Sequence, residues 1–122
     1  MIRVVHYDHN RFFSNNLRES LVQNLSEYPN VNYLDYNPGS DIFETIRGDL
    51  EKLLPEKDVL LIHPGVKGQE VISSYPIKFP HLKIAYVIVG EFEAYQELNG
   101  IRLFLGCRDI KRIVNFILEP KK

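Results

Sequence analysis

The sequence predicts an α/β domain in which a sheet of five parallel strands, in the order 2-1-3-4-5, lies between layers of helices. Along the 122 residues, short β-branched or apolar runs alternate with segments whose apolar residues recur at helical spacing. The run at residues 59–62 and most of the run at 84–89 are apolar throughout, as in central strands that are buried on both faces. Right-handed crossovers then place helices on both faces of the sheet and favour the stated order.

The first two strand–helix pairs occupy the first half of the chain. Residues 2–7 form a β-branched run, and the helix predicted after it ends at Pro29; its apolar stripe is Phe13, Leu17, Leu21, Leu25 and Tyr28. Residues 31–36 alternate apolar and polar side chains, as a half-buried or edge strand would. Asp41 and Glu44 resemble a capping pair for a second helix that Pro55 ends. Its stripe is Ile42, Phe43, Ile46, Leu50, Leu53 and Leu54.

The second half of the chain has room for shorter helices. Residues 69–75 can form only a short helix before Pro76, and residues 91–98 predict another short helical piece. Residues 101–105 predict the fifth strand. A final helix stops at Pro120, and its stripe is Ile110, Ile113, Val114, Ile117 and Leu118. Since no linker or repeat interrupts this alternation, we expect one domain over residues 1–122.

Composition limits the classes of function. Fifteen basic and sixteen acidic residues give a net charge of -1, which offers no attraction for the backbone of nucleic acid. The one cysteine, Cys107, cannot form an internal disulfide, and no apolar run approaches the roughly 20 residues that a membrane span needs. The first residues enter a strand without a cationic region before a hydrophobic one. We therefore expect a cytoplasmic protein that binds neither nucleic acid nor a membrane.

Unusual polar residues stand where the first and third strands end. His6, Tyr7, Asp8 and His9 follow one another at the end of the first strand, and His63 ends the third. In parallel sheets, functional groups gather at the carboxyl ends of the strands, beside the point where the strand order reverses. Three of the four histidines are therefore expected at one edge of the sheet.

In length, element order and the spacing from Asp58 to His63, the whole chain resembles a response-regulator receiver domain, which has a three-layer flavodoxin-like fold. The resemblance implies a magnesium site made of two acidic residues after the first strand and a phosphorylated Asp after the third, because hard oxygen ligands suit that cation. Asp8 falls at one acidic position, but Tyr7 takes the place of the other and His63 that of the acceptor.

Two further positions of that family pattern also differ. The Ser or Thr expected after the fourth strand falls at Val89 and Gly90, and the Lys expected after the fifth is replaced by Gly106. The resemblance therefore implies a degenerate receiver, or pseudo-receiver, that is not phosphorylated on Asp. We expect no catalytic residues, cofactor or metal, and a regulatory role in signal transduction.

The strand-end histidines leave an alternative open. His63 before Pro64 could carry a phosphoryl group on its imidazole, or be a loop residue bonded to backbone. Asp8, His9 and His63 could bind a transition metal, although no HxxxH, HxH or paired-cysteine spacing supports it. Cys107 reads equally as a small buried filler or as a thiol nucleophile. The alternative to a pseudo-receiver is thus a phosphohistidine-carrying or metal-assisted phosphotransfer protein.

Other residues bear on binding. Gly65 and Gly68 around Lys67 match neither phosphate-loop spacing nor the dinucleotide fingerprint, so turn geometry is the better account. Four aromatic residues in the short, proline-broken elements could either anchor an interface or cover the sheet: Tyr75, Phe79, Phe92 and Tyr95.

In receivers the usual partner surface is built from the fourth helix, the fifth strand and the fifth helix. The matching positions here are Phe92, Tyr95, Arg102 and Lys111. We therefore expect contact with a protein partner, or a homodimer, through this surface.

Overall fold

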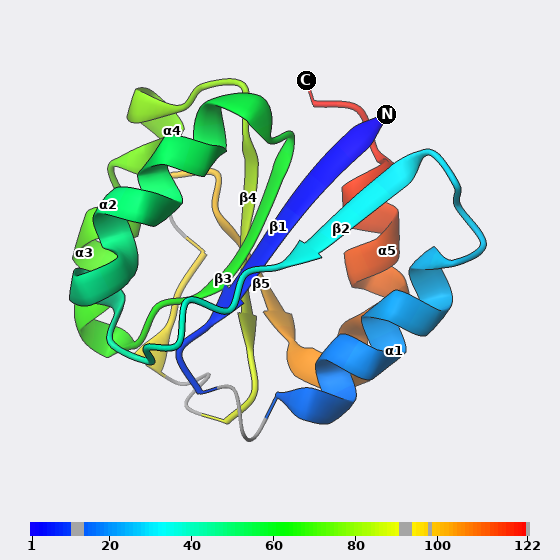
Figure 1. Ribbon diagram of the computed structural model, residues 1–122, viewed down its shortest axis with the longest axis horizontal. Helices are drawn as coiled ribbons and strands as arrows, with labels where there is room; N and C mark the ends of the chain where they lie inside the picture. Colours follow the sequence, from blue (N-terminus) through cyan, green and yellow to red (C-terminus); the bar gives the residue numbers. More distant parts are fainter. Residues whose placement is uncertain (11–13, 91–93, 98, 122) are drawn as a thin grey trace.

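A computed structural model describes residues 1–10, 14–90, 94–97 and 99–121. It contains one five-stranded parallel sheet with the order β2-β1-β3-β4-β5, as predicted (Figure 1). The strands are β1 (Ile2–Asp8), β2 (Val31–Asp35), β3 (Val59–His63), β4 (Lys83–Ile88) and β5 (Arg102–Leu105). The helices are α1 (Asn15–Leu25), α2 (Phe43–Leu53), α3 (Gln69–Ile72), α4 (Tyr75–Lys78) and α5 (Ile110–Leu118). Figure 1 shows α1 and α5 on one face of the sheet and α2, α3 and α4 on the other.

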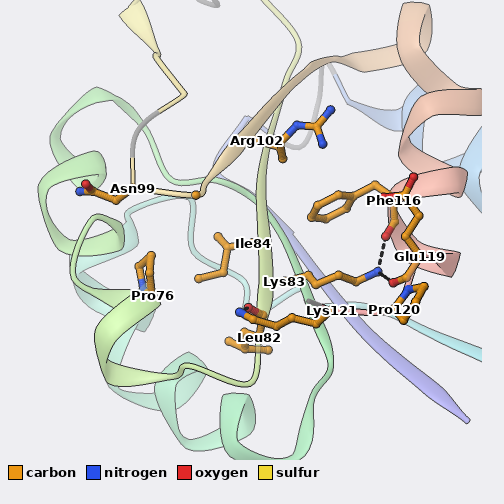
Figure 2. A pocket seen from close by; sticks show the side chains of 11 residues that line it. Pro76, Leu82, Lys83, Ile84, Asn99, Arg102, Phe116, Glu119, Pro120 and Lys121 are labelled. Carbon is orange, nitrogen blue, oxygen red and sulfur yellow. Dashed lines mark hydrogen bonds between the residues drawn. The ribbon is translucent and has the colours of Figure 1, made fainter.

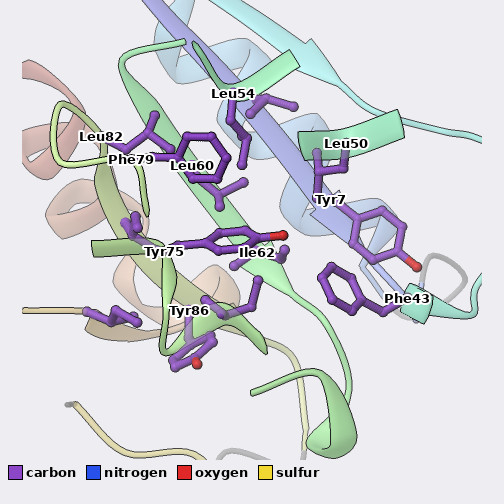
Figure 3. Close-up of a cluster of buried hydrophobic side chains, with 14 of the residues drawn as sticks. Tyr7, Phe43, Leu50, Leu54, Leu60, Ile62, Tyr75, Phe79, Leu82 and Tyr86 are labelled. Atoms are coloured by element: carbon purple, nitrogen blue, oxygen red, sulfur yellow. The ribbon is translucent and has the colours of Figure 1, made fainter. Parts of the chain in front are cut away.

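The sheet separates two apolar layers, and β3 contributes to both. All five of its residues are buried, with Leu60 and Ile62 in the layer under α2, α3 and α4, and Val59 and Leu61 in the layer under α1 and α5. Successive side chains of a strand point to opposite faces, so a continuously apolar strand fills both layers. Figure 3 shows the first layer, where aromatic rings from β1, α2, α4 and β4 surround Leu60 and Ile62.

The second helix begins later than its sequence pattern indicates. Ile42 precedes the first turn in an extended conformation, and no side chain caps that turn. The predicted capping pair of Asp41 and Glu44 is therefore wrong. The chain turns just before the helix instead, where the hydroxyl of Ser40 accepts a hydrogen bond of 3.2 Å from the amide of Ile42.

Residues 69–78 form two short helices instead of one. A helix tolerates proline in its first turn, where no intrahelical partner exists for an amide, and Pro76 occupies that position in α4. Glu51 of α2 anchors α4 by accepting hydrogen bonds from the Tyr75 hydroxyl, at 2.8 Å, and from the Lys78 ammonium. Arg47 also donates to Glu51, at 2.8 Å.

These contacts shift the pKa values of Glu51 and Tyr75. Burial opposes ionisation of Glu51, but the hydrogen bonds from Lys78, Arg47 and Tyr75 outweigh it and lower its pKa to about 2. Burial and the neighbouring Glu51 carboxylate raise the pKa of Tyr75 well above its usual range. Tyr75 and Phe79 are buried, so these two aromatic residues cover the sheet.

A pocket of about 420 Å³ lies at the amino ends of β4 and β5, opposite the strand-end histidines (Figure 2). Lys83 enters it from β4 and donates to the backbone oxygens of Phe116, Ile117 and Glu119 at the end of α5. Carbonyls at the end of a helix lack intrahelical partners, and a lysine ammonium satisfies them. Burial lowers the pKa of Lys83, although Glu119 and Asp58 oppose this shift. The charge on this wall of the pocket therefore stabilises α5.

Within the described residues, no helix has both the length and the apolar character that a membrane crossing requires.

Candidate functional site

The parallel pairing of β1 with β3 brings the two unusual strand ends together. Asp8 stands opposite His63 in the register, and the amide of His9 extends the contact by donating to the backbone oxygen of His63 at 2.9 Å. Both strands end at the point where the order of the sheet reverses. Of the three histidines expected at this edge, the structure brings His9 and His63 together, beside Asp8.

A buried acid–imidazole pair forms the centre of this edge. Oδ1 of Asp8 lies 3.3 Å from Nδ1 of His63, and the two side chains are 1% and 0% exposed. Oδ1 also accepts a hydrogen bond of 2.6 Å from the amide of Asn10. Burial disfavours the charged carboxylate, but the hydrogen bond and charge of His63, the amide of Asn10 and the charge of His6 together lower the pKa of Asp8. Asp8 is thus held as a carboxylate.

Aromatic rings surround His63. The ring of His9 meets it edge to face with centroids 4.5 Å apart, and the ring of Tyr95 does so at 5.4 Å. Tyr95 in turn packs against Tyr86 of β4, with centroids 5.0 Å apart. These contacts exclude solvent from the imidazole of His63.

The same contacts bury Tyr95, which was expected on the partner surface. Only 3% of its surface is accessible, because its ring fills the space between His63 and Tyr86. Of the predicted helical piece at residues 91–98, the structure describes residues 94–97. Phe92, the other aromatic residue expected to bind a partner, lies outside the described residues.

Neighbouring residues of β1 make contacts of their own. Tyr7 is fully buried in the layer under α2, where its ring packs beside Tyr36 and Phe43. His6 is bonded through Nδ1 to the hydroxyl of Tyr33 on β2, at 2.5 Å. The structure therefore places His9 and His63 in contact, and directs His6 toward the β2 edge.

The position after β5 is closed to the lysine side chain that the family resemblance implies. Gly106 has a φ of +33°, and a Cβ atom built there would lie 2.9 Å from Cγ2 of Val89 and 3.2 Å from the backbone oxygen of Ile88. A side chain at this position would require both a strained backbone and a shift of Val89. The local backbone is thus shaped for glycine.

The loop after His63 has steric reasons for its glycines. Gly65 has a φ of +84°, which favours glycine. A Cβ atom on Gly68 would lie 2.6 Å from Cβ of Pro64 and 3.2 Å from the ring of Phe43. Close packing and turn geometry therefore explain the pair, as the sequence suggested.

The remaining candidates lie on β5, on α5 and on the turn between them. Arg102 and Lys111 are exposed on β5 and α5, and Arg102 pairs with Glu97 at 3.7 Å. Cys107 is exposed, so its interpretation as a buried filler is wrong. In the described part of the chain, no group of three or more His, Cys, Asp or Glu side chains is arranged to hold a metal ion.

Sequence reasoning missed two sets of contacts. One is the attachment of α4 to α2, in which Tyr75 and Lys78 bind Glu51. These two residues follow Glu51 in the sequence by 24 and 27 positions. The other is a pair of carboxylates, Glu97 and Asp109, that accept hydrogen bonds from backbone amides of β5. Asp109 follows Leu105 by only four residues, so the sequence held a usable signal for the contacts with β5. Nothing in the sequence pointed to the attachment of α4.

Comparison with known proteins agrees with this architecture. The chain is similar in fold to the response regulator RcsB of Salmonella typhimurium, with a TM-score of 0.60 and 19% sequence identity. The match covers 94% of this chain and 58% of the RcsB chain, whose structure is described in terms of conformational dynamism for DNA interaction. At this identity the likeness establishes the fold alone. No protein-family model and no curated protein matches the sequence.

The protein thus has a receiver-like α/β fold. It spans less than two thirds of the regulator chain to which it is similar.

Proposed function

We propose that this chain is a signalling pseudo-receiver, which works through contact with a protein partner and is not phosphorylated on aspartate. The observation that carries the proposal is the buried pair of Asp8 and His63. It occupies the place where the family resemblance implies magnesium and an acceptor carboxylate.

The chemistry of the pair supports this proposal. Magnesium binds through oxygen ligands in near-octahedral geometry and usually keeps several waters. Asp8 is 1% exposed and directs one oxygen to both His63 and the Asn10 amide, while the neighbouring strand end supplies an imidazole in place of a second carboxylate. A cation would have to displace these contacts and draw water into a closed site. The environment of Asp8 therefore favours a structural role for its contact with His63.

Burial also weighs against the phosphohistidine alternative. An imidazole that accepts a phosphoryl group must be reached by the donor, whereas His63 is fully buried among Asp8, His9 and Tyr95. The loop that follows it uses Gly65 and Gly68 for turn geometry and packing. No contact in the described residues favours this alternative over the pseudo-receiver.

Exposed charge supplies a surface for the partner. Four basic side chains are exposed on β5, on the turn after it and on α5, and we call this set the basic surface: Arg102, Arg108, Lys111 and Arg112. The chain as a whole carries a net charge of -1, so this concentration is local. Arg102 and Arg112 are paired with Glu97 and Asp109, and Arg108 and Lys111 supply the rest of the positive charge. Complementary potentials steer partners and fix their orientation. The basic surface therefore fits a protein partner with an acidic face.

The proposal is tested by capturing partners with the tagged chain from its source cells and measuring their recovery by quantitative mass spectrometry. Lys111→Glu should reduce recovery of the specific partner several-fold, because it reverses a charge within the basic surface. Lys52→Glu is the matched control, since Lys52 is also an exposed lysine on a helix but lies on α2. His63→Gln should keep the partner. Loss of the partner with His63→Gln, together with its retention by Lys111→Glu, would transfer the function to the strand-end histidines.

A further inference from the structure

The outer edge of β5 carries an unusual arrangement of hydrogen bonds. β5 ends the sheet and pairs with β4 on one side only. The amide of Leu103 donates to Oε1 of Glu97 at 3.2 Å, and the amide of Leu105 donates to Oδ2 of Asp109 at 2.7 Å. Successive amides of a strand face opposite edges, so these two residues, two positions apart, present their amides on the side away from β4. Carboxylates thus occupy two outward amides of this four-residue strand.

Each of the two carboxylates is held by an arginine. Nε of Arg102 lies 3.7 Å from Oε1 of Glu97, and Nη1 of Arg112 lies 3.5 Å from Oδ1 of Asp109. Both guanidinium groups lie 5.5 Å from the centre of the Phe104 ring, a distance typical of cation–π contacts. Phe104 is buried and packs edge to face on Phe116. One fixed ring therefore orients both ion pairs.

This arrangement changes what the strand edge can bind. An exposed edge with available amides is a template for another strand, and proteins protect such edges with charged side chains. A carboxylate on an outward amide satisfies the donor and puts negative charge where the carbonyl oxygen of an incoming strand would have to lie. Strand addition must therefore first displace two charge-assisted hydrogen bonds.

We propose that Glu97 and Asp109 close the β5 edge to strand addition by a second copy of this chain. An antiparallel pairing of β5 with itself, with the two-fold axis at Phe104, would place Leu103 of each copy opposite Leu105 of the other. Those are the residues whose outward amides now bind carboxylates. Such a pairing is self-complementary, as an isologous interface must be.

The surface along this edge has room for the second strand. A hollow of about 490 Å³ is lined by Leu103 and Leu105, by the two carboxylates, and by Arg108 and Arg112. Glu97 is 54% exposed and its bond to the amide is the longer, whereas Asp109 is 14% exposed. Glu97 therefore blocks the edge less strongly than Asp109, and its removal alone should have the smaller effect on self-association.

The test is sedimentation equilibrium of the full chain over a wide range of concentration. The wild-type protein should show no association through β5, and Glu97→Ala with Asp109→Ala should strengthen self-association at least tenfold. Glu97→Gln should stay like the wild type, because its amide oxygen still accepts from Leu103. Asp49→Ala removes an equally negative, 78% exposed carboxylate on α2 and should change nothing. Adding Leu103→Pro to the double variant removes one outward donor and should reverse its association.

Hydrogen exchange of the Leu103 and Leu105 amides identifies the edge involved. In the double variant these amides should exchange faster than in the wild type at low concentration, and become protected as the concentration rises. The proposal fails if a folded double variant stays monomeric, if the wild type already pairs through β5, or if Asp49→Ala associates equally. Should the double variant not fold, Glu97→Ala alone decides between the same outcomes, because Glu97 is an exposed residue.

Discussion

Nδ1 of His63 lies 3.3 Å from Oδ1 of Asp8, and the two residues stand opposite each other in the ladder between β1 and β3. The pair closes the edge of the sheet at which parallel α/β domains usually place their functional groups. Its charge state therefore bears on stability as well as on function.

The first prediction concerns the acid side of the stability profile. The pKa of Asp8 is lower in the folded protein than its ordinary value of 3.8. The stabilisation from its carboxylate is therefore complete above about that value, and is lost as pH falls through the lower folded pKa. Asp8→Asn should be less stable than the wild type by about 1–3 kcal/mol near neutral pH, and the difference should shrink toward pH 2. Urea unfolding across this range measures it; a difference independent of pH would contradict the assignment.

The second prediction concerns Glu51, whose pKa falls from 4.5 to about 2 on folding. Its stabilising effect should be complete above the unfolded value and be lost between these two pH values. Glu51→Gln should destabilise the domain by about 1–2 kcal/mol near neutral pH, because it weakens the attachment of α4 through Tyr75 and Lys78. Hydrogen exchange should show the loss first in α4. Uniform changes across the sheet, with α4 unaffected, would argue against this attachment.

The third prediction compares two glycines. Gly106→Ala should cost about 1–3 kcal/mol, because its φ is +33° and the new Cβ would meet Val89. Gly48→Ala should stabilise the domain by about 0.5–1 kcal/mol, since Gly48 lies inside α2 with no atom within 4 Å of a new Cβ. Thermal unfolding of the two variants measures both effects. Equal effects of the same sign would show that the backbone at Gly106 is not specialised.

The fourth prediction follows from the burial of Tyr95. Tyr95→Ala should destabilise the domain by about 3 kcal/mol, because it leaves a cavity between His63 and Tyr86. Ile77→Ala is the control: Ile77 is 87% exposed on α4, and its loss should change stability by less than about 0.5 kcal/mol. If Tyr95→Ala folds with wild-type stability, the described packing of this ring is wrong.

Much of the fold could be predicted from the sequence, because the central strands are apolar on both faces and every helix after a strand is bounded by proline or a turn. The alternation of Leu60 and Ile62 with Val59 and Leu61 shows why the pattern was informative, since each pair fills a different layer. The start of α2 was misjudged because capping depends on backbone geometry at Ile42, which composition does not reveal.

The candidate site could be predicted only in part. Strand order placed Asp8 near His63, but their pairing required the register between β1 and β3. Burial of Tyr95 depends on contacts with residues far away in the sequence, so its aromatic character alone could not distinguish an interface anchor from a core residue. The role of Arg102 in orienting Glu97 was hidden for the same reason.

The most direct test of the pseudo-receiver proposal is the intact mass of the protein after incubation with acetyl phosphate and magnesium, beside a receiver domain known to be phosphorylated. We expect the control domain to gain a phosphoryl group and this chain to keep its unmodified mass, because Asp8 is committed to His63 and Gly106 leaves no room for a lysine. A stoichiometric phosphoryl adduct on this chain, lost in Asp8→Asn or His63→Gln, would contradict the account.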